Sequence, residues 1–177
     1  MFLDKNHLDN IEKINKLWTN LCELSEFAQS FGINDIFQDN GAKTLQQLLF
    51  LNLHNLQGRE GNDAVDANGE QWELKSINIR TTASGFSTNH HLNHDILKKY
   101  RQVYWSFAIY DGINLKEIYV LNPSQLEIYF KRWEDKLNNE RSYLNNPKIS
   151  IKFVKKNGLL VYSIDYAMLK NPSSIYL

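Results

Sequence analysis

The chain has 177 residues, of which 42% are hydrophobic and 12% aromatic, a composition that excludes a disordered protein and suits one domain with one core. Its twenty basic and twenty acidic side chains cancel to a formal net charge of zero, so the total charge does not indicate nucleic acid. No run approaches the roughly 18 apolar residues of a membrane span, and we find no secretion signal in the polar start "MFLDKNHLDN". Together with the single Cys22, expected in the core, these features predict a cytoplasmic protein with no membrane partner.

The charges are unevenly distributed along the chain. Residues 33–75 carry seven acids against three bases, and residues 131–156 carry eight bases against three acids. A neutral total therefore hides a segment of net −4 and a segment of net +5, which is compatible with an acidic site beside a basic surface.

The sequence up to residue 102 predicts two helices, a hairpin and a short basic helix. Apolar residues recur at helical spacing over residues 9–31 and 43–55. Residues 62–79 are predicted to form a β-hairpin around Asn68-Gly69. Residues 90–102 are predicted as a loop that enters a short basic helix.

The second half predicts strands on both sides of a helix. Residues 103–110 and 115–121 are expected to be strands, and a helix over 122–139 is expected to begin with Asn122 as its cap. Two apolar segments, 148–154 and 158–164, are predicted to form a final hairpin. The expected class is mixed α/β (α+β), with a central mixed sheet flanked by helices.

The predicted hairpin carries the residues with chemical potential. Side chains alternate faces along a strand, so Glu73 and Lys75 share one face, which we expect to point outward. A two-residue hairpin loop would place Asp66 on the face of Glu73, whereas a three-residue loop would place Asp63 directly across from it. The residues alone leave both acids open.

Two carboxylates at close range repel and raise one pKa unless a cation lies between them. Mg²⁺ binds one or two carboxylates together with waters and phosphate oxygens, polarises a phosphoryl oxygen and lowers the pKa of a bound water. The ammonium of Lys75 would stabilise the charge that develops on the phosphate. The alternative is a solvated, charged hairpin, because acids and lysines are common.

Several blocks match a known family in order and spacing over about residues 8–163: "GINDIFQDNG", "GREGNDAVD", "ELKSINI", "GFST", "KYRQV" and "NNPKI". They resemble the PvuII-type type II restriction endonucleases of the PD-(D/E)XK nuclease superfamily. The resemblance implies a restriction-endonuclease-like fold and a homodimer that cuts both strands of double-stranded DNA with Mg²⁺. It also implies the target 5′-CAGCTG-3′, blunt ends, and functional pairing with a protective DNA methyltransferase.

The resemblance assigns the catalytic positions to Asp63, Glu73, Lys75 and Tyr100, and the metal positions to Asp63, Glu73 and Glu60. It thereby selects Asp63 over Asp66 and implies the three-residue loop. Glu60 would bind a second metal indirectly or orient water, unless it is a surface acid. Tyr100 matches a tyrosine near the reacting phosphate, its alternative being a half-buried helix residue.

The resemblance also implies DNA contacts from three segments, through Asp39, Asn40, Ser87, Thr88, Asn89, His90, His91, Asn145, Asn146 and Lys148. The segment 87–91 would read the major groove, since its donors and acceptors suit base edges. The asparagine pair before Pro147 would contact adenine or form a turn. Asp39 and Asn40 would approach the minor groove or cap the following helix.

The match is incomplete in the recognition region. Asn89 stands where the family has a histidine, and the loop over 80–85 is one residue longer, so the outer base-pair preference is not carried over. Phosphate contacts are expected from Lys98, Lys99, Arg101, Lys148 and the basic C-terminal hairpin, although basic helix faces are often merely solvated.

We expect a single domain over residues 1–177 with three parts. Residues 1–58 would form a helical region with dimer contacts, 59–163 the catalytic and DNA-recognition core, and 164–177 a tail. Two alternatives are a repair or junction nuclease of the same superfamily and a non-catalytic DNA-binding module. The intact catalytic acids and lysine argue against the second.

Overall fold

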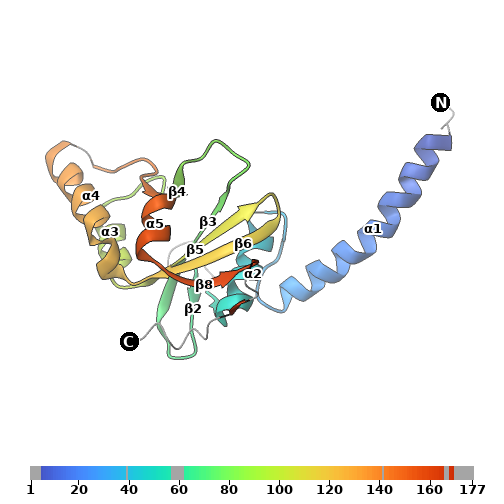
Figure 1. The fold of residues 1–177 in the computed structure, drawn as a ribbon, viewed down its shortest axis with the longest axis horizontal. Coiled ribbons are helices and arrows are strands. Elements are labelled where there is room, and N and C mark those ends of the chain that lie inside the picture. The colour runs from blue at the N-terminus through green and yellow to red at the C-terminus, as the bar shows by residue number, and fades with distance from the viewer. Residues whose placement is uncertain (1–4, 39, 57–61, 141, 166–167, 170–177) are drawn as a thin grey trace. The chain divides into compact units, whose positions relative to one another are not determined.

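The structure is a computed structural model that describes residues 5–38, 40–56, 62–140, 142–165 and 168–169. The chain divides into two compact units, Met1–Leu45 and Gln46–Leu177. The helices of the described residues are α1 (Lys5–Gln29), α2 (Gly41–Leu51), α3 (His94–Tyr100), α4 (Glu127–Glu140), α5 (Ile151–Asn157) and the 3₁₀ turn η1 (Pro123–Leu126) (Figure 1). None of these helices is long and apolar enough to cross a membrane.

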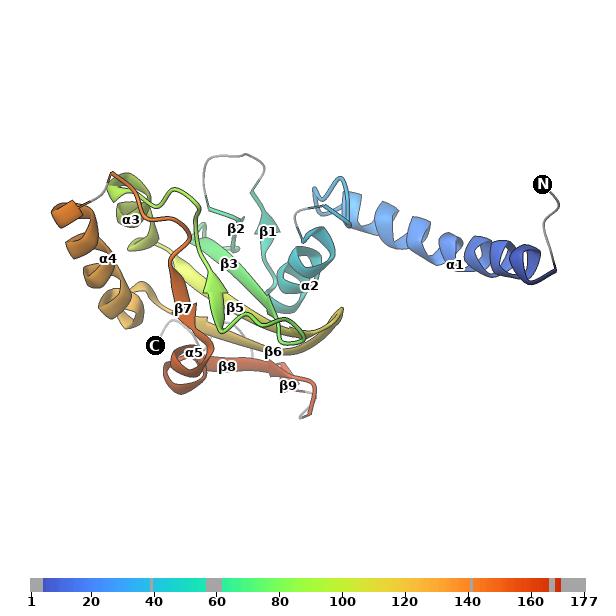
Figure 2. The same cartoon turned by 90° about the horizontal axis from the view of Figure 1, so that it is seen from above.

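The strands form a large mixed sheet and a small one, both within the second unit. The large sheet has the order β1-β2-β3-β5-β6-β8-β9, in which β3 and β5 are parallel and the other neighbours antiparallel; the small sheet pairs β4 with β7 (Figure 2). The strands are β1 (His54–Asn55), β2 (Ala64–Val65), β3 (Gln71–Asn78), β4 (Gly85–Ser87), β5 (Tyr104–Asp111), β6 (Asn114–Leu121), β7 (Lys148–Ser150), β8 (Leu159–Ser163) and β9 (Met168–Leu169). The predicted α+β class, with a central mixed sheet and helices, is confirmed.

The core of the second unit is built around β5. Six successive residues of this strand are buried, as expected for a strand covered on both faces. Trp105 and Phe107 are fully buried, and their rings pack against Phe130 of α4 and Phe86 of β4. The aromatic residues thus join the large sheet, the small sheet and α4 around one core.

Several predicted elements are found with small shifts. The helix expected over 9–31 is α1, on which Cys22 is exposed rather than buried in a core. The second helix ends at Leu51 instead of residue 55, because Asn52 adopts a positive φ of 53° and the chain turns into β1. The helix over 122–139 is present as η1 and α4, and Asn122 forms the predicted cap.

The predicted final hairpin is wrong. Residues 148–150 form β7, which pairs with β4 some sixty residues earlier, and residues 151–157 form α5 before β8 begins. Val154 is buried on the inner side of α5, and Lys155 and Lys156 occupy its last turn, where cations favour the helix dipole. The prediction was wrong because it paired residues 148–154 with the next segment in sequence, whereas β7 pairs with the distant strand β4.

Gly85 allows β4 to approach β7 closely. A Cβ atom at this position would lie 2.8 Å from the carbonyl oxygen of Ile149, a backbone atom that cannot rotate away. We expect Gly85→Ala to lower the free energy of unfolding by about 1–3 kcal/mol, as for other overpacked sites. Urea unfolding checks this, with Ser87→Ala on the same strand as control. Equal stability of the alanine variant and the parent would contradict the close packing.

Candidate active site

The hairpin of β2 and β3 has the longer of the two possible loops. Ala64 pairs with Trp72, and the Asp66 N–H donates to the Glu70 carbonyl at 3.0 Å, which leaves a three-residue loop closed by Gly69 at φ +84°. The predicted three-residue loop is therefore confirmed. One position beyond the paired residues, this register sets Asp63 across from Glu73.

Asp66 stabilises the loop itself. Its Oδ1 accepts hydrogen bonds from the N–H groups of Asn68 at 2.8 Å and Glu70 at 3.0 Å. Its Oδ2 accepts a hydrogen bond from the indole N–H of Trp72 at 3.3 Å. Both oxygens of this carboxylate are engaged in the turn, so Asp66 fixes the register that brings Asp63 to Glu73.

Asp63 is held by the opposite strand. Its Oδ2 accepts a hydrogen bond from the Leu74 N–H at 2.7 Å, and its own N–H donates to the Trp72 carbonyl at 3.0 Å. Within the described chain, its Oδ1 receives no hydrogen bond. One oxygen therefore anchors the side chain, and the other can face a ligand.

Glu73 is buried, not outward-facing as expected for a charged residue of the hairpin. It is only 5% exposed, and its carboxylate interacts with Lys75 and with the Tyr100 hydroxyl. Its Oε1 lies 2.5 Å from Nζ of Lys75, which is itself largely buried. Burial raises the pKa of Glu73 above its ordinary value, the Lys75 ammonium opposes this rise, and the Asp63 carboxylate adds to it.

The two acids form a donor set suited to a hard divalent cation. Asp63 and Glu73 offer carboxylate oxygens in a half-buried site where a single ammonium faces two negative charges. Mg²⁺ binds one or two such carboxylates and completes its shell with water and phosphate oxygens. No group of three or more His, Cys, Asp or Glu side chains arranged for a metal occurs among the described residues. Glu60, the third acid assigned from the resemblance, lies outside them.

Tyr100 lies beside Glu73 and Asp63. It is 4% exposed, so it is not a half-buried surface tyrosine, and its hydroxyl interacts with the side chains of Glu73 and Asn89. Burial raises the pKa of Tyr100 well above its ordinary value, and the charges of Glu73 and Asp63 raise it further, so the hydroxyl stays protonated. Trp105, the β5 neighbour of Glu73, donates its indole N–H to the Tyr100 carbonyl at 3.2 Å and packs edge-on against the Tyr100 ring.

Two of the segments predicted to contact DNA lie side by side. Ser87 pairs with Lys148 in the small sheet, and the Thr88 hydroxyl donates to the Pro147 carbonyl at 2.7 Å. The Asn146 N–H donates to the Asn89 carbonyl at 2.9 Å. The structure therefore joins residues 87–91 and 145–148 into one surface.

Some side chains on this surface are exposed, and others are held by hydrogen bonds or ring stacking. Ser87, His90, Asn145 and Lys148 are exposed, whereas the Asn89 Oδ1 accepts a hydrogen bond from the His91 N–H at 2.7 Å. The His91 ring stacks on Tyr143 with centroids 4.6 Å apart and planes inclined by 7°. Tyr143 was not predicted as part of this surface, and only its proximity to the asparagine pair in sequence could have indicated it.

The third predicted segment belongs to the first unit, whereas the other two belong to the second. Asp39 lies outside the described residues. Asn40 belongs to the first unit, where it adopts a positive φ of 64° and accepts a hydrogen bond from Lys43 Nζ at 3.2 Å. Its DNA contact remains a prediction.

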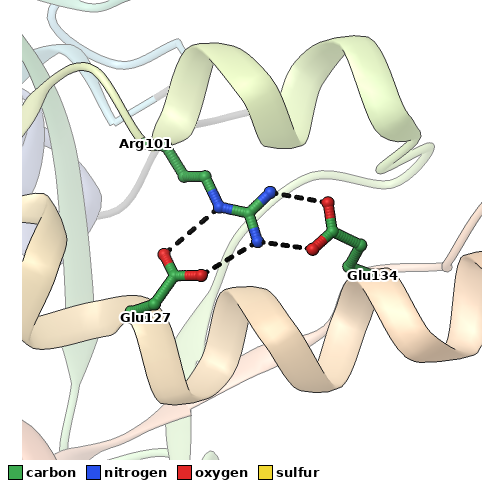
Figure 3. Close-up of polar contacts among 3 residues, drawn as sticks. All are labelled: Arg101, Glu127 and Glu134. Atoms are coloured by element: carbon green, nitrogen blue, oxygen red, sulfur yellow. Dashed lines mark hydrogen bonds and ion pairs between the residues drawn. The ribbon is translucent and has the colours of Figure 1, made fainter.

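Arg101 is not available for the phosphate contact expected of it. Its guanidinium is held between two acids of α4, with hydrogen bonds to Glu127 at 3.2 and 3.0 Å and to Glu134 at 2.8 and 2.8 Å (Figure 3). The two forks fasten the end of α3, which carries Tyr100, to α4. Sequence reasoning missed this network, although Glu127 and Glu134 are seven residues apart and so share one face of the predicted helix.

The sequence matches a known family over most of its length. A family model described as restriction endonuclease PvuII matches residues 9–162. The matched range includes Asp63, Glu73, Lys75 and Tyr100, together with both segments of the joined surface.

The ion pairs of Arg101 with Glu127 and Glu134 should stabilise the fold in a pH-dependent way. We expect Arg101→Met to lower the free energy of unfolding by roughly 1–2 kcal/mol at pH 7, since the forks are bidentate but the acids are about one third exposed. Arg101 holds the pKa of Glu134 below its ordinary value, so this stabilisation is complete above the unfolded carboxyl pKa and disappears as pH falls through the lowered one. Urea unfolding from pH 7 to pH 3 measures the difference.

The control for this prediction is Lys99→Met, which removes an exposed cation from α3 that has no ion pair in the described chain. It should leave stability within about 0.5 kcal/mol of the parent. A pH-independent effect of Arg101→Met would contradict the electrostatic account.

Proposed function

Because the chain belongs to the restriction endonuclease PvuII family and is therefore a type II site-specific deoxyribonuclease, we propose that it cuts double-stranded DNA at 5′-CAGCTG-3′ to blunt ends with Mg²⁺. Enzymes of this family typically use a divalent metal ion. The observation that carries the proposal is the buried Glu73 carboxylate, which the hairpin register sets across from Asp63 and beside Lys75. Paired buried charges of this kind are typical of catalytic sites.

In this proposal Asp63 and Glu73 hold the metal ion. Glu60, which lies outside the described residues, would bind a second metal indirectly or orient water. Mg²⁺ bound there would polarise a phosphate oxygen and lower the pKa of water. The Lys75 ammonium stabilises the negative charge that develops on the phosphate. The buried Tyr100 hydroxyl contacts the Glu73 carboxylate and would help to hold it in place.

The joined surface would read the bases. Its residues Ser87, Thr88, Asn89, His90, His91, Asn145, Asn146 and Lys148 combine donors and acceptors that suit the major groove. Their arrangement side by side supports a single recognition surface, because the two segments are hydrogen-bonded to each other. Asp39 and Asn40 are proposed to approach the minor groove, as the family resemblance implies.

A palindromic target implies a two-fold dimer, since each subunit then meets the same half-site. We assign dimer contacts to residues 1–58, catalysis and recognition to 59–163, and leave 164–177 as a tail. Within the first unit, α1 leaves Ile14, Leu17 and Trp18 exposed, which suits contact with a second copy. A cytoplasmic enzyme of this type also requires a methyltransferase that protects host DNA.

The direct test is digestion of plasmid DNA of known sequence. With Mg²⁺ we expect discrete fragments whose blunt ends map to the centre of CAGCTG, and with a chelator we expect intact DNA. Nicking that follows DNA structure instead of sequence would favour a repair or junction nuclease. Site-specific binding with no cleavage in Mg²⁺ would contradict a catalytic role.

Lys75→Ala tests the charge that faces the phosphate. Removing one preorganised charge from an active site lowers the rate by about 10²–10³, so we expect slow cleavage with specific DNA binding retained. Single-turnover cleavage and gel-shift titration measure the two quantities. Parental cleavage by this variant would show that Lys75 has another role.

Asp66→Asn is the matched control within the same hairpin. The hydrogen bonds described for Asp66 come from the loop and from Trp72, and an asparagine keeps the Oδ1 that accepts the two loop bonds, so the variant should lose stability but keep the rate constant of cleavage within a few-fold of the parent. A loss as large as that of Lys75→Ala in a variant that is still folded would contradict a purely structural role for Asp66.

A further inference from the structure

A groove of about 350 Å³ lies between α4 and the segment that leads into β7. Trp133 of α4 and Leu144 of that segment, both buried, form its apolar floor. Three exposed cationic side chains line it: Arg132 and Lys136 of α4, and Lys148 of β7. The two α4 residues are four positions apart and therefore lie on one face of the helix.

The three cations of the groove have no acidic partner within the described chain. Other cations near the core do have one: Lys75 pairs with Glu73, Arg101 with two acids of α4, and Lys155 with Glu117. Among the described residues, no carboxylate lines the groove. The basic segment over 131–156 therefore places unpaired positive charges around this groove. Such a groove favours a negatively charged ligand.

The groove adjoins the joined surface of residues 87–91 and 145–148, which we call the recognition surface. Leu144 is bridged to Leu92, and Lys148 pairs with Ser87, so the segment that forms one wall of the groove also carries the residues proposed to contact bases. Asn145, one of those residues, lines the groove itself. A duplex bound along residues 87–91 would therefore bring its sugar-phosphate backbone toward this wall.

We propose that this groove is a phosphate-binding site for the DNA backbone, with Arg132 and Lys136 as contacts beyond those assigned above. The inference rests on the proposed function, because it takes DNA as the ligand. Phosphate contacts fix the position of a duplex but carry no sequence information. The groove therefore contributes affinity and register, and leaves the choice of target to the recognition surface.

The test is the salt dependence of DNA binding by the full chain without divalent metal, so that no cleavage occurs. Arg132→Met with Lys136→Met removes two charges and keeps the length of the side chains. Each lost phosphate contact reduces the slope of log K against log salt by about 0.9, so the slope should fall by about 1.8. Affinity for a CAGCTG duplex and for a scrambled duplex should fall by the same factor, roughly tenfold or more near 0.1 M salt.

The matched control is Lys152→Met with Lys156→Met, which removes two exposed cations from α5, outside the groove. This variant has the same net charge as the groove variant, so it reports the effect of net charge alone. Its slope should stay near that of the parent. Urea unfolding checks that both variants are folded.

The groove assignment is overturned if the groove variant keeps the parental slope, or if it loses no more than the α5 control. It is also overturned if only the affinity for CAGCTG falls, because the residues would then read bases. If the parent cuts and binds DNA and the groove variant binds DNA with the same affinity and salt dependence, only the groove proposal is refuted. A parent that binds no DNA refutes the proposed function and the groove together.

Discussion

The buried carboxylate of Glu73 is the constraint on which the site depends. Removing an ionised carboxylate from water is costly unless other charges and hydrogen bonds compensate for it. The structure provides Lys75 at 2.5 Å and the Tyr100 hydroxyl, and it places a second acid, Asp63, close enough to increase the cost. Replacing such a cluster with apolar residues of similar volume is often neutral or stabilising. Packing therefore does not explain two acids in this position, whereas a divalent cation that neutralises both does.

The convergence of the two acids depends on a loop that contains neither of them. A shift of one residue in a β-hairpin moves every side chain of the strand to the opposite face. Asp66 prevents that shift, because its two oxygens accept three hydrogen bonds from the loop and from Trp72. The two aspartates that the residues alone could not distinguish thus have separate tasks: one fixes the register, and the other uses it.

Local sequence signals predicted the local features of the fold. The Asn-Pro start of the 122–139 helix and the hairpin at Asn68-Gly69 depend on neighbouring residues, and both are present. The strand β7 was paired wrongly because its partner β4 is distant in sequence. The burial of Glu73 and the enclosure of Arg101 also depend on tertiary packing, in which β3 is covered and α3 meets α4. The register that selects Asp63 came from the resemblance, since hairpin geometry permitted both loops.

Asn89 connects the joined surface of residues 87–91 and 145–148 to Tyr100 and Glu73. Its carbonyl accepts a hydrogen bond from Asn146, its Oδ1 accepts one from His91, and its side chain interacts with the Tyr100 hydroxyl beside Glu73. Tyr100 is fixed in turn by Trp105 and by the Arg101 forks to α4. A displacement of Asn89 would therefore change the surroundings of both the two joined segments and the Glu73 carboxylate.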